Sequence, residues 1–287
     1  MEVMKGTVFS SSLFMPYGSW TSGVEGPACD AEGNLYAVNY QVNHTIGRVT
    51  PSGDASVFIT LPNGSIGNGI RFNSKGDMLI ADYTNHNILK VDMKTRELAV
   101  YAHDPGMHQP NDIAITSTDI LFASDPDWPN LKGRIWRILP DGSMKILDEN
   151  MGTTNGIEVS PDDKTLYVNE SEQRRIWAYD LSPDGGISNK RIFMEFPDYG
   201  MDGMRCDVNG NLFLTRYHKG TILKIAPNAV PVLEVYLDGK RCSNICFGGP
   251  DGCTCYVTMA DTGCVETFRT DIPGREWMLY RKWGLAK

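Results

Sequence analysis

Hydrophobic and polar positions along this chain follow a pattern that occurs six times. Each copy opens on a polar residue, continues through a short apolar run, turns at Asp, Gly or Asn, and ends in a second apolar run followed by polar residues. The copies begin at Glu25, Asn68, Asn111, Asn155, Asp202 and Asn244, at intervals of 43, 43, 44, 47 and 42 residues. A period of this length built from short strands is typical of a β-propeller, in which each copy forms one blade.

The second copy shows what each unit contains. β-prone runs at 69–73 and 77–81 are separated by the turn Ser74-Lys75-Gly76, and two more polar strands are expected at 87–92 and 97–102. Alternating polar strands suit the exposed outer edge of a blade. No helical pattern interrupts the copies, which account for residues 25 to about 280.

We therefore predict an all-β chain, a single domain over residues 1–287 that forms a six-bladed β-propeller with four strands per blade. The alternative is an all-β sandwich whose strands happen to share this spacing. The segment before the first copy, 6–15, is also β-prone. We expect it to complete the last blade and close the ring, because this leaves no unpaired sheet edge between the termini.

The opening residue of every copy carries a side-chain oxygen, and two of the six, Glu25 and Asp202, are carboxylates. Because the innermost strands of a propeller line its channel, we expect these six side chains to converge at one end of it. Asn and Asp also begin strands without binding anything. A ring of oxygens without His or Cys nevertheless favours a hard cation such as Ca²⁺.

The second strand of each copy returns to the same end of the channel. Fourteen or fifteen residues after the opening residues it delivers Asn39, Asp82, Asp125, Glu170, Arg216 and Met259. Each of these, taken singly, is more often a solvated loop residue than a functional one. Of this set and its neighbours, we expect Asp125, Arg216 and His218 to contact a substrate.

Composition narrows the classes of partner. The formal net charge is −8 and no long Lys/Arg run occurs, so we expect no nucleic-acid partner. No signal-like N-terminus and no long apolar run are present, so we expect no membrane partner and a cytoplasmic location. The seven Cys lack zinc-site spacing and are expected to be reduced core thiols. The sequence indicates a small-molecule substrate and identifies no protein partner.

Several short motifs occur in an order that is found in a known family. They are Glu25-Gly-Pro, Pro110-Asn-Asp, Asn155-Gly-Ile, Asp202-Gly-Met and Cys242-Ser-Asn. Across residues 20–265 the chain resembles the senescence-marker-protein/gluconolactonase (regucalcin-like) family of propeller lactonases, and more distantly diisopropylfluorophosphatase and the paraoxonases.

This resemblance implies a set of site residues. Glu25, Asn155 and Asp202 would bind a divalent metal, Ca²⁺ first, with Zn²⁺, Mn²⁺ or Mg²⁺ as alternatives. Asn111 would bind either metal or substrate, and Asp202 would serve as general base or nucleophile. The chain departs from the regucalcin-like pattern before Asn111, where an Arg of the family is replaced by Gln109-Pro110.

Three functions are consistent with these observations. The leading hypothesis is a metal-dependent hydrolase of a small lactone, in which the metal polarises the carbonyl group and Asp202 activates water or attacks directly. Phosphotriester hydrolysis at the same metal is the first alternative. The second is a non-enzymatic NHL-like binding propeller, which the run from Ala81 to Val91 resembles. The two carboxylates among the ring residues favour an enzyme.

Overall fold

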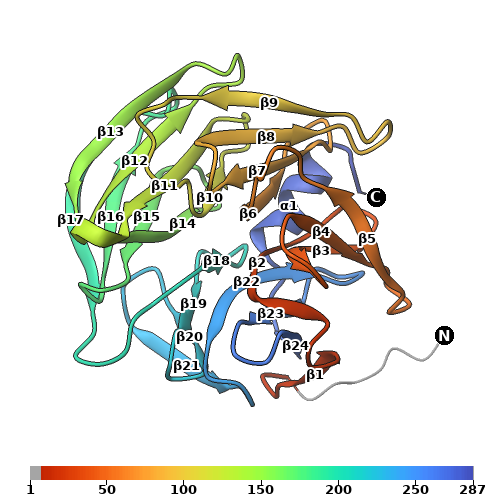
Figure 1. Cartoon of the computed structure of the whole chain (residues 1–287). Helices are drawn as coiled ribbons and strands as arrows, with labels where there is room; N and C mark the ends of the chain where they lie inside the picture. Colours follow the sequence, from red (N-terminus) through yellow and green to blue (C-terminus); the bar gives the residue numbers. More distant parts are fainter. Residues whose placement is uncertain (1–7, 287) are drawn as a thin grey trace.

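The structure is a computed structural model, and it describes residues 8–286. Six four-stranded sheets lie around one axis (Figure 1). The first three blades consist of β2 (Trp20–Cys29), β3 (Leu35–Tyr40), β4 (Thr45–Val49) and β5 (Ala55–Thr60); β6 (Gly67–Phe72), β7 (Met78–Asp82), β8 (Asn87–Val91) and β9 (Leu98–His103); and β10 (Ile113–Ile115), β11 (Leu121–Asp127), β12 (Lys132–Ile138) and β13 (Met144–Met151).

The remaining blades continue the order. They consist of β14 (Thr154–Val159), β15 (Thr165–Glu170), β16 (Arg175–Leu181) and β17 (Ile187–Glu195); β18 (Met204–Cys206), β19 (Leu212–Arg216), β20 (Thr221–Ile225) and β21 (Pro231–Tyr236); and β22 (Cys242–Gly248), β23 (Thr254–Met259), β24 (Cys264–Arg269) and β1 (Ser12–Met15). The six-bladed all-β prediction is confirmed, and the four strands of the second copy lie within two residues of their expected bounds.

The ring is closed by an N-terminal strand, as expected, although β1 covers only Ser12–Met15 of the predicted segment 6–15, and residues 6 and 7 lie outside the described residues. β1 pairs antiparallel with β24, with Ser12 opposite Thr267 and Leu13 opposite Glu266. The last blade therefore combines three strands from the C-terminal part of the chain with one from the N-terminal part. This pairing covers an edge of β24 that would otherwise be exposed.

The hydrophobic core is divided among the interfaces between neighbouring blades. Between the first two blades, for example, Val38 and Ile46 pack with Ile70 and Ile80, and all four are fully buried. Inner strands such as β6 are buried at every position, whereas outer strands such as β17 are largely exposed. All seven Cys are buried and free, in agreement with their expected role as core thiols.

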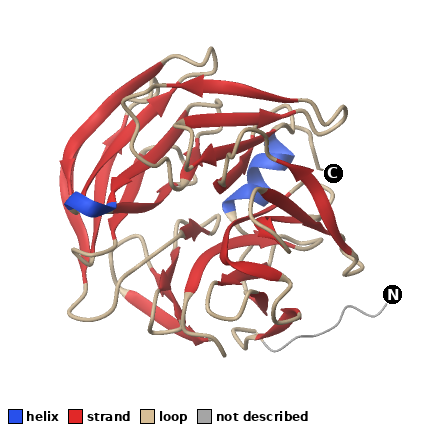
Figure 2. Cartoon of the chain, in the orientation of Figure 1, coloured by secondary structure: helices blue, strands red, loops and turns tan. Residues whose placement is uncertain are grey.

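The chain also contains helices, which the repeat pattern did not predict (Figure 2). A short 3-10 helix, η1 (Trp128–Asn130), follows β11, and an α-helix, α1 (Arg275–Lys282), follows the last blade. The expectation of uninterrupted strands to about residue 280 is wrong at this point. Glu276 in the first turn and Lys282 in the last turn complement the helix dipole.

Helix α1 lies across the end of the channel where the innermost strands finish. Tyr280 Oη donates to the carbonyl of Cys29 at 2.6 Å, and Trp283 Nε1 donates to the carbonyl of Ser117 at 2.9 Å. Cys29 ends β2, so the helix is at the end opposite the residues that open the repeats. Neither helix of the described residues has the length and apolar character needed to cross a membrane.

Candidate active site at the mouth of the channel

A pocket of about 910 Å³ occupies the end of the channel where the innermost strands begin. Five of the six repeat-opening residues line it: Glu25, Asn68, Asn111, Asn155 and Asp202. The sixth, Asn244, lies beneath them. Its Nδ2 donates to Glu25 Oε2 at 2.9 Å and approaches Asp112 Oδ2 at 3.4 Å. The structure therefore brings the predicted ring together, with Asn244 as a support for Glu25.

Glycine lets the innermost strands approach the axis closely. It follows the opening residue in four copies, at Gly26, Gly69, Gly156 and Gly203. A Cβ on Gly203 would lie 2.0 Å from the side chain of Asn244, and a Cβ on Gly26 would lie 1.9 Å from the carbonyl oxygen of Asn68. Any side chain at these positions would push neighbouring strands apart and separate the ring residues.

The two carboxylates of the ring lie on the pocket floor, enclosed by protein on their other sides. Burial and the negative charge of Asp112 raise the pKa of Glu25 to about 7, although the backbone N–H of Gly26 and Asn244 donate hydrogen bonds to it. Burial and the charge of Glu25 raise the pKa of Asp202 well above its usual range. Buried carboxylates whose pKa values are raised by burial and by neighbouring negative charge form an environment that a bound divalent cation would relieve.

Two amide oxygens on the same floor lack partners. Asn155 Nδ2 donates to Ser171 Oγ at 3.0 Å, which leaves Asn155 Oδ1 as the free acceptor. Within residues 8–286, the buried Oδ1 atoms of Asn155 and Asn111 accept no hydrogen bond. A buried acceptor without a partner costs about 1–3 kcal/mol, so a ligand that used these atoms would be favoured.

Together these four residues fit a hard divalent cation. They offer carboxylate and amide oxygens, which Ca²⁺ prefers, and water or substrate could complete its usual 6–8 ligands. The described residues contain no cluster of three or more His, Cys, Asp or Glu suited to a metal. A site of two acids and two amides is therefore less suited to Zn²⁺, which prefers His and Cys.

Several aromatic side chains contribute to the walls of the pocket. Tyr83, Trp128, Tyr199 and Tyr217 line it. His218, one of the expected substrate contacts, also lines it and packs edge-on against Tyr217, with ring centroids 4.6 Å apart. Aromatic faces among polar side chains suit a small molecule that carries both apolar and polar groups.

Asp125, a second expected substrate contact, does not reach the pocket. Its carboxylate is fully buried and accepts hydrogen bonds from the backbone N–H groups of His108 at 2.8 Å and Gln109 at 2.7 Å, and from Trp136 Nε1 at 2.8 Å. The expected position is wrong because these bonds turn the side chain into the blade. Asp125 instead fixes the segment that leads to Asn111.

Arg216, the third expected substrate contact, also does not line the pocket. Its Nη2 donates to the carboxylate of Asp198 at 2.7 Å, and its guanidinium lies over the ring of Phe196, 4.0 Å from the centroid. These contacts hold the loop before Asp202 and leave the side chain 3% exposed.

Sequence reasoning missed Arg174, which is the only Lys or Arg among the described residues that line the pocket. It lies in the loop after β15, four residues beyond Glu170, with a φ of 58° and its Nη1 donating to the carbonyl of Pro197 at 3.3 Å, and the repeat pattern gives no signal for it.

Comparisons with known proteins point to one family. The model of the SMP-30/gluconolactonase/LRE-like region matches residues 22–261. The chain is 27% identical over 261 residues to a gluconolactonase of Zymomonas mobilis, covering 78% of this chain and 72% of that protein. It is 26% identical over 173 residues to a pentonolactonase of Haloferax volcanii, covering 59% of each.

Among solved structures, a calcium-binding protein, regucalcin, from Agrobacterium tumefaciens matches with a TM-score of 0.79. The match covers 94% of this chain and 95% of that one at 21% identity. At this identity the likeness establishes the fold alone. The chain spans only part of the length of the curated relatives, from 59% to 72% for the two described above.

Proposed function

This chain belongs to the SMP-30/gluconolactonase/LRE-like family, and from that premise we propose that it is a lactonase. It would hydrolyse the ring ester of a small lactone in the pocket at the mouth of the channel. Glu25, Asn155 and Asp202 would hold a divalent cation, Ca²⁺ first, with Asn111 as a further ligand or a contact to the substrate.

One observation carries this proposal. Two carboxylates with raised pKa values and two buried amide oxygens without partners meet on the floor of a single pocket. Relatives named gluconolactonase and pentonolactonase support a lactone as substrate. A protein of the same fold is named as calcium-binding, which makes Ca²⁺ the first ion to test.

Different residues of the pocket would have different roles in the reaction. When bound, the cation would supply a Lewis acid for the lactone carbonyl. Asp202 would accept the proton of the attacking water, or attack the carbonyl carbon itself. In the general-base route the ring C–O bond would then break, and Asp202 would return the proton to the departing oxygen. In the nucleophilic route ring opening would leave an anhydride on Asp202, the departing oxygen would take a proton from water, and a further water would hydrolyse the anhydride to regenerate the carboxylate. Asn111 and His218 would donate hydrogen bonds to the substrate, whose ring would lie against the aromatic walls.

Removing the metal tests this function directly. We expect a chelator to abolish hydrolysis of a panel of sugar and aliphatic lactones, and added CaCl₂ to restore it more fully than Zn²⁺, Mn²⁺ or Mg²⁺. Hydrolysis by metal-free protein would contradict the proposal. A preference for phosphotriesters would favour the alternative enzyme, and Ca²⁺ binding without any hydrolysis would favour a binding propeller.

The raised pKa values predict how Ca²⁺ binding depends on pH. In metal-free protein burial raises the pKa of Glu25 from the ordinary 4.5 to about 7, so between these pH values the folded state keeps a proton that the unfolded state has lost. The contribution of Glu25 to the free energy of unfolding therefore falls as pH rises from 4.5 to 7. Ca²⁺ requires the ionised carboxylates, so its affinity should fall as pH decreases below 7. We expect the increase in Tm caused by Ca²⁺ to be larger at pH 8 than at pH 5. Glu25→Gln should flatten this trend; an equal increase at both pH values in the wild type would contradict the assignment.

Three sequence-based expectations stay predictions: the cytoplasmic location, the single domain over residues 1–287, and the absence of a nucleic-acid or membrane partner.

A further inference from the structure

The channel below the pocket is filled with charged side chains. Arg71, Asp112, Glu158, Arg205, Arg275 and Glu276 form an ion network there, and the first five are at most 4% exposed. Four blades and helix α1 contribute to it. Three of these residues are carboxylates and three are guanidinium groups, and Arg275 also pairs with Asp163 at 2.6 Å, so every charge lies close to an opposite one. Buried ions are costly unless they are paired, so this arrangement constrains the position of each member.

A continuous path of contacts runs from α1 to the pocket floor. Glu276 Oε1, on the helix, lies 3.6 Å from Arg205 Nε. Arg205 Nη1 donates to Asp112 Oδ2 at 3.0 Å. Asn244 Nδ2 bridges Asp112 Oδ2 at 3.4 Å and Glu25 Oε2 at 2.9 Å. Each step joins residues far apart in the sequence, and the last is one of the proposed cation ligands.

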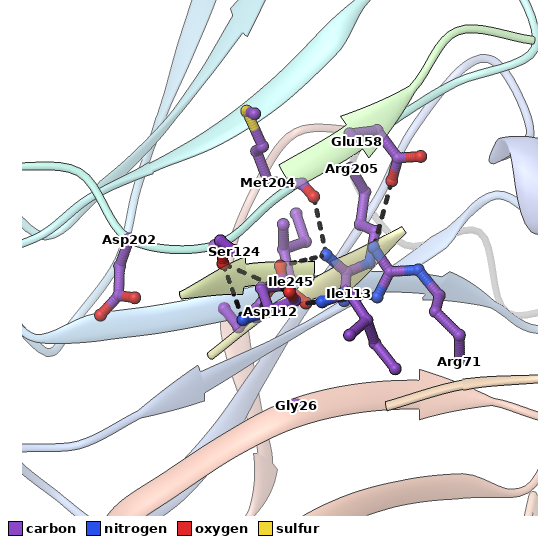
Figure 3. Close-up of polar contacts among 12 residues, drawn as sticks. Gly26, Arg71, Asp112, Ile113, Ser124, Glu158, Asp202, Met204, Arg205 and Ile245 are labelled. Carbon is purple, nitrogen blue, oxygen red and sulfur yellow. Dashed lines mark hydrogen bonds and ion pairs between the residues drawn. The ribbon is translucent and has the colours of Figure 1, made fainter. Parts of the chain in front are cut away.

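Asp112 is the junction of the network. Arg205 contacts one of its oxygens, and Arg71 Nη1 lies 3.5 Å from the other, which also accepts the backbone N–H of Ile113 at 2.9 Å. Figure 3 shows Asp112 in contact with these groups in the channel, while Asp202 lies apart at the ring. With both oxygens engaged, the Asp112 carboxylate has a fixed orientation, and it presents a fixed acceptor to Asn244.

Helix α1 itself is held firmly on the channel end. Arg275 Nη2 contacts Asp163 Oδ1 at 2.6 Å, and its Nη1 donates to the carbonyl of Ile115 at 2.8 Å. Tyr280 anchors the next turn on Cys29, as described above. The carboxylate of Glu276 is therefore delivered to Arg205 by a helix that is attached to at least three blades.

We propose that helix α1 is a functional part of the active site, in which Glu276, acting through Arg205, Asp112 and Asn244, positions Glu25 for cation binding. This inference rests on the proposed cation site. Glu276, Arg205 and Asp112 are positioning residues, since none of them lines the pocket. Removing the charge of Glu276 makes the network one unit more positive, which opposes a cation at the ring. Arg205 also loses a contact that fixes its guanidinium.

Glu276→Gln tests this proposal, because it removes one charge and keeps the size of the side chain. Titration with CaCl₂ alone, followed by calorimetry, should show a Kd raised about tenfold, the low end of the range for residues that orient metal ligands. At saturating Ca²⁺, kcat and KM for a lactone should return close to wild-type values. Glu276→Asp, which keeps the charge, should bind Ca²⁺ with a Kd nearer to that of the wild type.

Tyr280→Phe is the matched control. It lies on the same helix and loses the hydrogen bond to Cys29, but it carries no charge and is outside the ion network. We expect it to lower Tm without changing the Kd for Ca²⁺. Equal weakening of Ca²⁺ binding by both variants would mean that the helix acts only through general stability, which would overturn the proposal.

The outcomes separate this inference from the proposed function. If the wild type bound no Ca²⁺, the proposed cation site would fail first. If the wild type bound Ca²⁺ and Glu276→Gln bound it equally well, only the role of α1 would be overturned. Should Glu276→Gln not fold, Arg205→Lys takes its place, with the same expected increase in Kd and the same contradicting result.

Discussion

Asp202→Asn is expected to reduce lactone hydrolysis by roughly 10²–10⁴-fold, the usual contribution of a positioned base. The substitution keeps an oxygen on the pocket floor and keeps the shape of the side chain. It removes the basic oxygen that would take the proton of water or attack the carbonyl carbon. It also removes a negative charge beside Glu25, so Ca²⁺ should bind more weakly but still measurably. Turnover at saturating Ca²⁺ and a calorimetric Kd measure the two effects separately.

Asp180→Asn provides the control for this experiment. Its carboxylate lies on the outer part of the fourth blade, where it is half exposed and pairs with Arg191 at 2.7 Å. The variant changes the net charge of the protein by the same amount and should retain full turnover. Near wild-type turnover by Asp202→Asn with Ca²⁺ bound would show that the base or nucleophile is another residue, and His218 would be the next to test.

The ring of opening residues was predictable because it depends on the repeat alone. In a propeller, residues at one position of the repeat lie at one height around the axis, whatever surrounds them. Glu25, Asn111, Asn155 and Asp202 line one pocket for this reason. Asn244 shares their position in the repeat, but its amide faces Glu25 and Asp112. The period thus indicates where a side chain begins but not which partner it contacts.

The side-chain directions at the ends of the second strands were less predictable, because the repeat does not specify the partners of these side chains. Asp125 and Arg216 begin at the expected height, but each is turned away from the pocket by groups that the repeat does not describe. For Asp125 these are backbone N–H groups 16 and 17 residues earlier in the chain, and for Arg216 it is Asp198, 18 residues earlier. Such bonds depend on loop conformations that differ between blades.

The ion network was not anticipated from the sequence at all. Arg205 and Asp112 are 93 residues apart, and nothing local in the sequence distinguishes them from solvated charges. Helix α1 follows a Pro-Gly pair and carries charges that suit its dipole, but it has only eight residues. From the sequence alone its charged residues would be assigned to the protein surface, because the sequence does not show the channel that they enter.

Gly26→Ala is expected to have the largest effect on stability. Gly26 has a φ of +56°, and a Cβ there would lie 1.9 Å from the carbonyl oxygen of Asn68, a backbone atom that cannot move without displacing β6. Left-handed strain and overpacking together should lower the free energy of unfolding by about 4 kcal/mol. The backbone N–H of Gly26 also donates to Glu25, so the same substitution should weaken Ca²⁺ binding. Urea denaturation of the metal-free protein and calorimetry with CaCl₂ measure the two losses.

Gly18→Ala separates close approach from backbone strain. Gly18 has a φ of +74°, similarly left-handed, but a Cβ there would meet no atom within 4 Å. Its substitution should therefore lower the free energy of unfolding only through backbone strain, by about 1 kcal/mol, and leave Ca²⁺ binding unchanged. Similar losses of stability in the two variants would show that the first two blades can separate without penalty. In that case the close packing of the inner strands would not be what holds Glu25 and Asn68 at the mouth of the channel.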